Sequence, residues 1–190
     1  MNNKIFSKIY GIDNNIKNYD LLKYNKDSLC EITLPSEAEI ITNIILNNSN
    51  NSMIIDCNGG MGGNTISFSK HFKVTCIEMN KDKYEILKNN LMILNINNVT
   101  LINDDSTNHL NYSDMIYFFD PPWGGINYKS YSNINLKLSS LSLYNIIKKI
   151  RETNNMNIYF KLPSNYNMDE FSEFKYKIYP IKNYQLVEFY

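Results

Sequence analysis

The chain has 190 residues with 19 basic and 19 acidic side chains, so its formal net charge is zero. This length suits one domain with a substantial core, and the neutral balance argues against a protein that coats long nucleic acid through charge alone. Three cysteines without CxxC spacing favour reduced thiols over a disulfide framework or a zinc site, and no run is apolar enough for a signal peptide or a bilayer span, so we expect an intracellular protein.

Helices and strands alternate in the first part of the chain. A proline followed by acidic residues and an isoleucine-rich face predicts a helix that begins at Pro35. Short apolar runs that end in acidic residues predict strands, and apolar residues at helical spacing predict the segments between them as helices. The predicted elements here are helix 35–47, strand 52–56, a glycine-rich loop 57–63, a helix from 64, strand 73–78, helix 81–94 and strand 99–103.

The second part continues this alternation and then changes. Strand 115–119, a helix from about Leu138 to Arg151 and strand 157–162 come first, followed by strands 174–180 and 184–190 around a Lys182-Asn183 turn. Such an order predicts an α/β fold of seven strands, mostly parallel, with helices on both faces and an antiparallel C-terminal hairpin. Ligands of open α/β sheets lie at the carboxyl ends of the strands.

Acidic residues at those strand ends indicate the kind of ligand. Four glycines in the loop 57–63 let the backbone approach a ligand closely, and Glu78, about twenty residues on, can accept both hydroxyls of a ribose. Asp56 suits the cationic amine of an amino acid, and Asp105, or Asp104 beside it, can accept from an adenine amino group. Adenine, ribose and an amino acid together make up S-adenosylmethionine, whereas an acid beside the loop disfavours the pyrophosphate of a dinucleotide.

The run Asp120-Pro-Pro-Trp-Gly-Gly follows the strand predicted at 115–119. Proline fixes its own φ and restricts the residue before it, so the Asp120 carboxylate and nearby carbonyls can face a flat substrate. Trp123, the only tryptophan, offers a stacking surface. This corner is suited to a planar amine that accepts a methyl group.

These motifs together resemble the trimethylguanosine synthase family. The resemblance is carried by Asp56-Cys-Asn-Gly-Gly-Met-Gly-Gly-Asn-Thr65, Ile77-Glu78, Asp120-Pro-Pro-Trp-Gly-Gly-Ile-Asn-Tyr128 and Tyr159-Phe-Lys-Leu-Pro-Ser-Asn165. Enzymes of that family methylate the exocyclic N2 amine of a 7-methylguanosine RNA cap with S-adenosylmethionine as the donor. The resemblance therefore implies a Rossmann-like class I methyltransferase with capped RNA as its partner, and it implies neither a metal nor a membrane.

Carried over by position, the resemblance implies site residues of three kinds. Asp120, Pro121 and Trp123 are expected at the reacting amine. The cofactor is expected to contact Asp56, Gly60, Asn64, Thr65, Glu78 and Asp105, and the substrate Trp123, Tyr128, Asn90, Lys161 and Asn165. Because 7-methylation makes guanine cationic, the indole face of Trp123 is its best π partner.

Two departures from the family pattern leave other substrates open. The chain has Asp120 where the family usually has serine, and Ser164 where the family has an arginine that contacts cap phosphates, with Lys161 as a candidate replacement charge. One alternative is an N-methyltransferase of adenine or guanine within RNA or DNA. Another is a non-catalytic methyltransferase-like subunit that binds a cap or a partner.

The N-terminal segment is the remaining expectation. We expect residues 1–34 to form a short segment that covers the substrate site and residues 35–190 to form the catalytic domain. Lys8, Ile16 and Tyr19 are the candidates for contacts from this segment.

Overall fold

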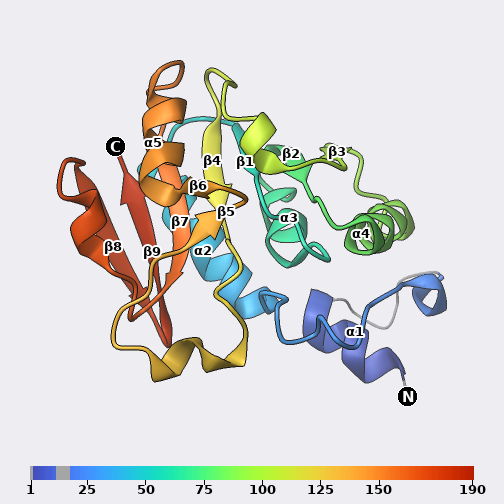
Figure 1. Ribbon diagram of the computed structural model, residues 1–190. Coiled ribbons are helices and arrows are strands. Elements are labelled where there is room, and N and C mark those ends of the chain that lie inside the picture. The colour runs from blue at the N-terminus through green and yellow to red at the C-terminus, as the bar shows by residue number, and fades with distance from the viewer. Residues whose placement is uncertain (1, 12–17) are drawn as a thin grey trace. The chain divides into compact units, whose positions relative to one another are not determined.

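The computed structural model describes residues 2–11 and 18–190, which form two compact units, residues 1–104 and 105–190. Figure 1 shows the helices and strands of both units. Among the helices of the described part, none is both long enough and apolar enough to cross a membrane.

The first unit combines a parallel three-stranded sheet with helices. The strands β1, β2 and β3 lie in the order β3-β2-β1, and Met53 of β1 is paired with Lys73 of β2. The helix α3 packs against β1 and β2, and α1 packs against α2 and α3. The bounds are α1 Asn2–Tyr10, η1 Tyr19–Leu21, α2 Pro35–Asn48, β1 Met53–Asp56, α3 Gly63–Phe68, β2 Lys73–Ile77, α4 Lys81–Ile93 and β3 Val99–Ile102.

Local sequence explains where these helices begin. Pro35 occupies the first position of α2, where its missing N–H is not needed. Asn80 caps α4 because its side-chain oxygen accepts a hydrogen bond from the N–H of Lys83 at 3.0 Å. Gly62 precedes α3 with a φ of 99°, a conformation that a side chain would strain.

The second unit holds four strands in the order β4-β7-β9-β8. β7 is parallel to β4 and antiparallel to β9, and β9 forms the closing hairpin with β8, drawn in red in Figure 1. A separate pair, β5 and β6, precedes the helix α5. The bounds are η2 Ser106–Asn108, β4 Ile116–Phe119, η3 Ile126–Ser130, β5 Lys137–Leu138, β6 Leu141–Ser142, α5 Leu143–Arg151, β7 Ile158–Pro163, η4 Met168–Phe171, β8 Tyr176–Ile181 and β9 Tyr184–Phe189.

The core of the second unit is aromatic. β4 and β7 are completely buried, and the rings of Phe119 and Phe160 on these two strands stack with centroids 4.7 Å apart. The apolar face of α5, which includes Ile146 and Ile150, is also buried. This packing fixes β4, which Asp120 directly follows, and β7, which carries Lys161.

The predicted fold class is confirmed: seven main strands, mostly parallel, end in an antiparallel hairpin within the described residues. One helix boundary was wrong, because α5 begins at Leu143 and not near Leu138. Ser139 has a φ of 52°, which interrupts a helix and turns the chain between β5 and β6. Ser142 then caps α5 by accepting a hydrogen bond from the N–H of Asn145 at 3.3 Å.

Candidate active site

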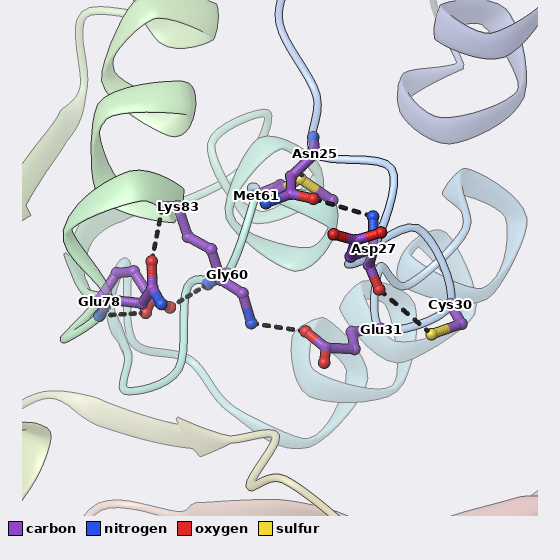
Figure 2. Close-up of polar contacts among 9 residues, drawn as sticks. Asn25, Asp27, Cys30, Glu31, Gly60, Met61, Glu78 and Lys83 are labelled. Atoms are coloured by element: carbon purple, nitrogen blue, oxygen red, sulfur yellow. Dashed lines mark hydrogen bonds and ion pairs between the residues drawn. The ribbon is translucent and has the colours of Figure 1, made fainter. Parts of the chain in front are cut away.

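The glycine-rich loop after β1 is shaped by its contact with Glu78. Gly60 has a φ of 54°, and a Cβ built on it would have no neighbouring atom within 4 Å. Its N–H donates to the carboxylate of Glu78, with the nitrogen 2.7 Å from Oε2 (Figure 2). The surface over Gly60 is therefore open, and the backbone can approach a ligand there.

Glu78 lies just after β2 and is 8% exposed. Its second oxygen, Oε1, accepts from the N–H of Asn80 at 2.7 Å, so the carboxylate is fixed between the glycine-rich loop and the start of α4. Backbone N–H groups satisfy part of this buried charge. The geometry brings Gly60 and Glu78 together, and their contact with a cofactor stays a prediction.

Asp56, at the end of β1, is completely buried. Its carboxylate accepts from the hydroxyl of Thr65 at 2.6 Å and from the N–H of Asn58 at 3.3 Å. The predicted cofactor residue Thr65 is itself fully buried and fixes the Asp56 carboxylate through this bond. Its contact with a cofactor stays a prediction. We refer to Asp56–Thr65 together with Glu78 as the loop site.

The segment before α2 lies against the loop site, which the sequence did not indicate. A Cβ on Gly63 would lie 2.4 Å from the carbonyl oxygen of Thr33, so only glycine permits this approach. The amide of Asn64, a predicted cofactor residue, donates to the hydroxyl of Thr33 at 3.1 Å. The backbone N–H of Asn25 contacts the sulfur of Met61 at 3.2 Å (Figure 2).

A salt bridge attaches the same segment to α4. The ammonium of Lys83 lies 2.5 Å from the carboxylate of Glu31 (Figure 2). We call residues 19–33 the strap, because their contacts with Met61, Asn64 and Lys83 hold them along the loop site and the first turn of α4.

Asn90 of α4 also holds the strap. Its side chain is completely buried. The oxygen accepts from the N–H of Lys23 at 2.8 Å, and the amide nitrogen donates to the carbonyl of Lys23 at 2.8 Å and to the hydroxyl of Tyr10 at 2.9 Å. Both amide hydrogens thus have protein partners, which gives Asn90 a positioning role; a contact with substrate stays a prediction.

The three N-terminal candidates differ in their surroundings. Tyr19 is buried, and its hydroxyl accepts from the N–H of Ser7 at 3.1 Å. Lys8 is exposed, and Ile16 lies outside the described residues.

Asp105 opens the second unit and caps η2. Its Oδ1 accepts from the N–H and the hydroxyl of Thr107 at 2.9 and 2.8 Å, and its Oδ2 accepts from the hydroxyl of Ser139. Asp105 is half-buried. These bonds fix the carboxylate that the sequence predicted for the cofactor's adenine.

Trp123 lies at the centre of an aromatic surface in the second unit. Its indole N–H donates to the carbonyl of Lys161 on β7 at 3.3 Å. The ring of Tyr128 meets it edge-on, with centroids 5.2 Å apart, and Tyr184 at the start of β9 lies 6.2 Å away. The indole is half-buried, and its orientation is fixed by the backbone of the neighbouring strand.

A buried ion pair lies beside this ring. The ammonium of Lys161 is 2.8 Å from Oδ2 of Asp120, and the two side chains are 8% and 14% exposed. The same ammonium lies 5.4 Å from the centroid of Trp123 and 5.1 Å from that of Tyr184. We call Asp120–Trp123 with Tyr128, Lys161 and Tyr184 the aromatic corner.

Asn165 fixes the loop that carries Tyr128. Its amide nitrogen donates to the carbonyls of Tyr128 and Tyr131 at 2.9 and 2.8 Å. Its side-chain oxygen is buried and has no hydrogen-bond partner among the described residues. Asn165 can therefore support Tyr128 and still accept one hydrogen bond from a ligand.

Sequence reasoning missed Thr33, Met61 and Tyr184. Gly63 was the one available signal for Thr33, since a glycine at the start of a helix can mark a close backbone approach. Tyr184 had no signal, because its place beside Trp123 depends on the pairing of β9 with β7. Among the described residues, no group of three or more His, Cys, Asp or Glu side chains is placed to hold a metal ion.

Solved structures share this fold at low sequence identity. A methyltransferase from Geobacter sulfurreducens is similar with a TM-score of 0.63 and 13% identity, over 94% of this chain and 96% of that one. These structures show a Rossmann-like fold, and together with the family model below the fold defines a methyltransferase, for which S-adenosylmethionine is the methyl donor.

Sequence comparison then gives the family. The family model described as RNA cap guanine-N2 methyltransferase matches residues 51–188, and the chain belongs to this family. Protein L320 of Acanthamoeba polyphaga mimivirus is 35% identical over 189 residues, covering 84% of this chain and 73% of its own length. The trimethylguanosine synthase of Schizosaccharomyces pombe is 38% identical over 85 residues, which are 40% of this chain and 35% of that protein.

Proposed function

We propose that the protein transfers a methyl group from S-adenosylmethionine to the exocyclic N2 amine of a 7-methylguanosine RNA cap. The observation that carries the proposal is the aromatic corner, in which a fixed indole lies next to the Asp120-Pro121 turn in a chain of the cap guanine-N2 family. A flat cationic base can stack on Trp123 while acceptors of the turn face its amine.

The loop site fits the methyl donor. Gly60 leaves open space above its backbone, and the buried side-chain oxygen of Asn58 has no hydrogen-bond partner among the described residues. Glu78 and Asp56 would hold the ribose hydroxyls and the cationic amine, and Asp105 the adenine amino group. When bound, S-adenosylmethionine supplies a sulfonium methyl group that a nitrogen nucleophile can take.

The residues of the aromatic corner would act by orientation. Stacking on Trp123, with Tyr128 at its edge, limits the purine to one plane. Carbonyls of Asp120 and Pro121 would accept hydrogen bonds from the amine as positive charge develops on its nitrogen. The nitrogen then loses a proton, for which Asp120 is the nearby carboxylate.

We also propose a role for the N-terminal segment. Residues 1–34 would cover the substrate, and the strap within them would enclose the donor, since it contacts Met61 and Asn64 of the loop site. Residues 35–190 would then form the catalytic domain.

Mass spectrometry of a 7-methylguanosine cap dinucleotide after incubation with the protein and the donor tests the activity. We expect a product heavier by one or two methyl groups, with the added mass on the guanine base. A cap that stays unchanged, while adenine-containing RNA or DNA is methylated under the same conditions, would refute the proposal.

Asp120 supports a second candidate, an N-methyltransferase of adenine or guanine within RNA or DNA. The carboxylate stands where the family usually has serine, and Lys161, the candidate replacement for the family's arginine, is buried and paired with it. A contact of Lys161 with substrate phosphates stays a prediction. The same assay with RNA and DNA oligonucleotides separates the two activities. If the protein were instead a non-catalytic binding subunit, calorimetric titration with S-adenosylmethionine would detect no binding.

A further inference from the structure

The Asp120–Lys161 pair changes what Trp123 can select. A bare indole prefers a cationic purine over a neutral one of the same shape. Here the ammonium of Lys161 already lies 5.4 Å from the indole centroid, within the range of a cation–π contact. A second cation on the same ring meets like-charge repulsion from this ammonium. The attraction that the Asp120 carboxylate could offer the second cation is shared with Lys161, 2.8 Å away.

Because the Asp120–Lys161 pair is buried, the ammonium is held beside the Trp123 ring and its repulsion of a second cation persists. Lys161 is 8% exposed, and it is held between Asp120 and the rings of Trp123 and Tyr184. An exposed lysine would be screened by solvent and would move away, whereas charges in partly buried positions act on each other with little screening. The fold thus fixes the positions of both charges, the ammonium on β7 and the carboxylate in the Asp120 turn.

We infer that Lys161, through its pair with Asp120, is a specificity-determining residue that lowers the preference for N7-methylated guanine, so the aromatic corner also accepts guanine without the methyl group. The inference rests on the proposed function, since it concerns the purine bound at Trp123. It extends the substrate class from 7-methylguanosine caps to guanine nucleotides with an unmodified N7.

The test uses the fluorescence of Trp123, which is the only tryptophan of the chain and reports stacking directly. The full chain is titrated with 7-methylguanosine triphosphate and with guanosine triphosphate, which carry the same phosphates. The measured quantity is the ratio of the two affinities in each variant. A partial loss of folded protein changes both affinities by the same factor, so the ratio is unaffected.

Two substitutions move this ratio in opposite directions. Lys161→Met leaves Asp120 without this cation and should raise the preference for the methylated nucleotide about fivefold, the size of one moderately desolvated cation–π contact. Asp120→Asn leaves the cation over Trp123 without its carboxylate and should lower the ratio below that of the wild type. Lys177→Met is the matched control, because Lys177 makes the same kind of contact, 4.7 Å from the ring of Tyr179, outside the aromatic corner.

The outcomes separate this inference from the proposed function. If the wild type binds both nucleotides and the two variants shift the ratio as described, the inference holds. If the wild type binds the methylated nucleotide alone, or if Lys161→Met leaves the ratio of the two affinities unchanged, the inference is overturned while the cap activity stands. Should neither nucleotide quench Trp123, the proposed function fails with it. If circular dichroism shows that Lys161→Met is unfolded, the test rests on Asp120→Asn. An affinity ratio in Asp120→Asn that equals or exceeds that of the wild type then overturns the inference.

Discussion

Gly60 and Gly63 lie three positions apart, but their surroundings predict opposite effects of the same substitution. Gly60→Ala adds a methyl group in open space and costs about 1 kcal/mol through its positive φ. We expect it to weaken donor binding strongly, because the methyl group enters the proposed ligand space. Gly63→Ala places a Cβ 2.4 Å from the carbonyl oxygen of Thr33 and should lower the free energy of unfolding by about 1–3 kcal/mol.

Urea denaturation and calorimetric titration with S-adenosylmethionine measure the two effects. We expect Gly63→Ala to have the larger loss of folding stability. We expect Gly60→Ala to have the larger loss of affinity for S-adenosylmethionine when the affinity is referred to the concentration of folded protein. Equal donor affinity in Gly60→Ala and the wild type would exclude the space above Gly60 as the ligand position.

Trp123 and Glu78 should separate substrate binding from donor binding. Trp123→Ala removes the stacking surface and should cost about 1–3 kcal/mol of cap-analogue binding, with donor affinity nearly unchanged. Glu78→Ala removes the carboxylate that fixes Gly60 and should weaken the donor while cap binding persists. Titration of both variants with both ligands checks this, and simultaneous loss of the two ligands in Trp123→Ala would assign the indole a structural role.

The three cysteines should differ in reactivity. Burial raises the pKa of the Cys57 and Cys76 thiols, and the nearby Asp56 carboxylate raises both further. A raised pKa favours the thiol over the reactive thiolate, whereas Cys30 is exposed. Mass spectrometry after brief iodoacetamide treatment at neutral pH should show one modified residue, Cys30, and full labelling in urea is the control. Rapid native labelling of Cys57 would contradict the buried environment.

Site residues at strand ends could be predicted from the sequence, and those defined by pairing could not. Asp56, Glu78 and Asp120 each follow an apolar run, so the alternation alone places them at carboxyl ends of strands. The salt bridge of Lys161 depends on β7 lying next to β4, which no local pattern specifies. The contacts of Asn90 with Lys23 likewise join positions 67 residues apart.

At the scale of elements, the strap depends on Asn90 of α4. Asn90→Ala leaves the N–H and carbonyl of Lys23 without their side-chain partner and should destabilise the fold by about 1–3 kcal/mol. The strap should open locally before the rest of the unit. Limited trypsin digestion should therefore cut near Lys23 and Lys26 faster than in the wild type.

Asn97→Ala is the matched control, because Asn97 is exposed and its amide contacts only the side chain of Asn95 among the described residues, at 3.3 Å. Unchanged cleavage of the strap in Asn90→Ala would show that its other contacts, with Met61, Asn64 and Lys83, suffice to hold it.

The elements were predictable where apolar periodicity was continuous. Helix α2 and strand β2 agree with their predicted ranges to within one residue. The region before α5 differs because its turn depends on Ser139 in a left-handed conformation, and serine gives no sign of this in the sequence. Helix α1 was not predicted. It packs against α2 and α3, and its buried residues Phe6 and Tyr10 contact Tyr19 of the strap and Asn90 of α4, respectively.

At the scale of the whole molecule, the zero net charge predicts a weak response to salt. Long RNA would bind mainly through its cap, with few phosphate contacts to release counterions. Between 50 and 200 mM salt, KM for a capped transcript should rise by less than about tenfold and stay close to that of a cap dinucleotide. A steep salt dependence for the transcript alone would indicate a phosphate-binding surface and favour methylation within RNA.

The position of β9 has a consequence for biosynthesis. Residues 184–189 pair with β7 on one side and with β8 on the other, so β8 has no ladder until this last strand is present. During translation, the aromatic corner therefore lacks Tyr184 and β8 lacks its partner strand until residues 184–189 have been synthesised. Until then the edge of strand β7 that β9 covers is unpaired, and an unpaired strand edge can bind other nascent chains.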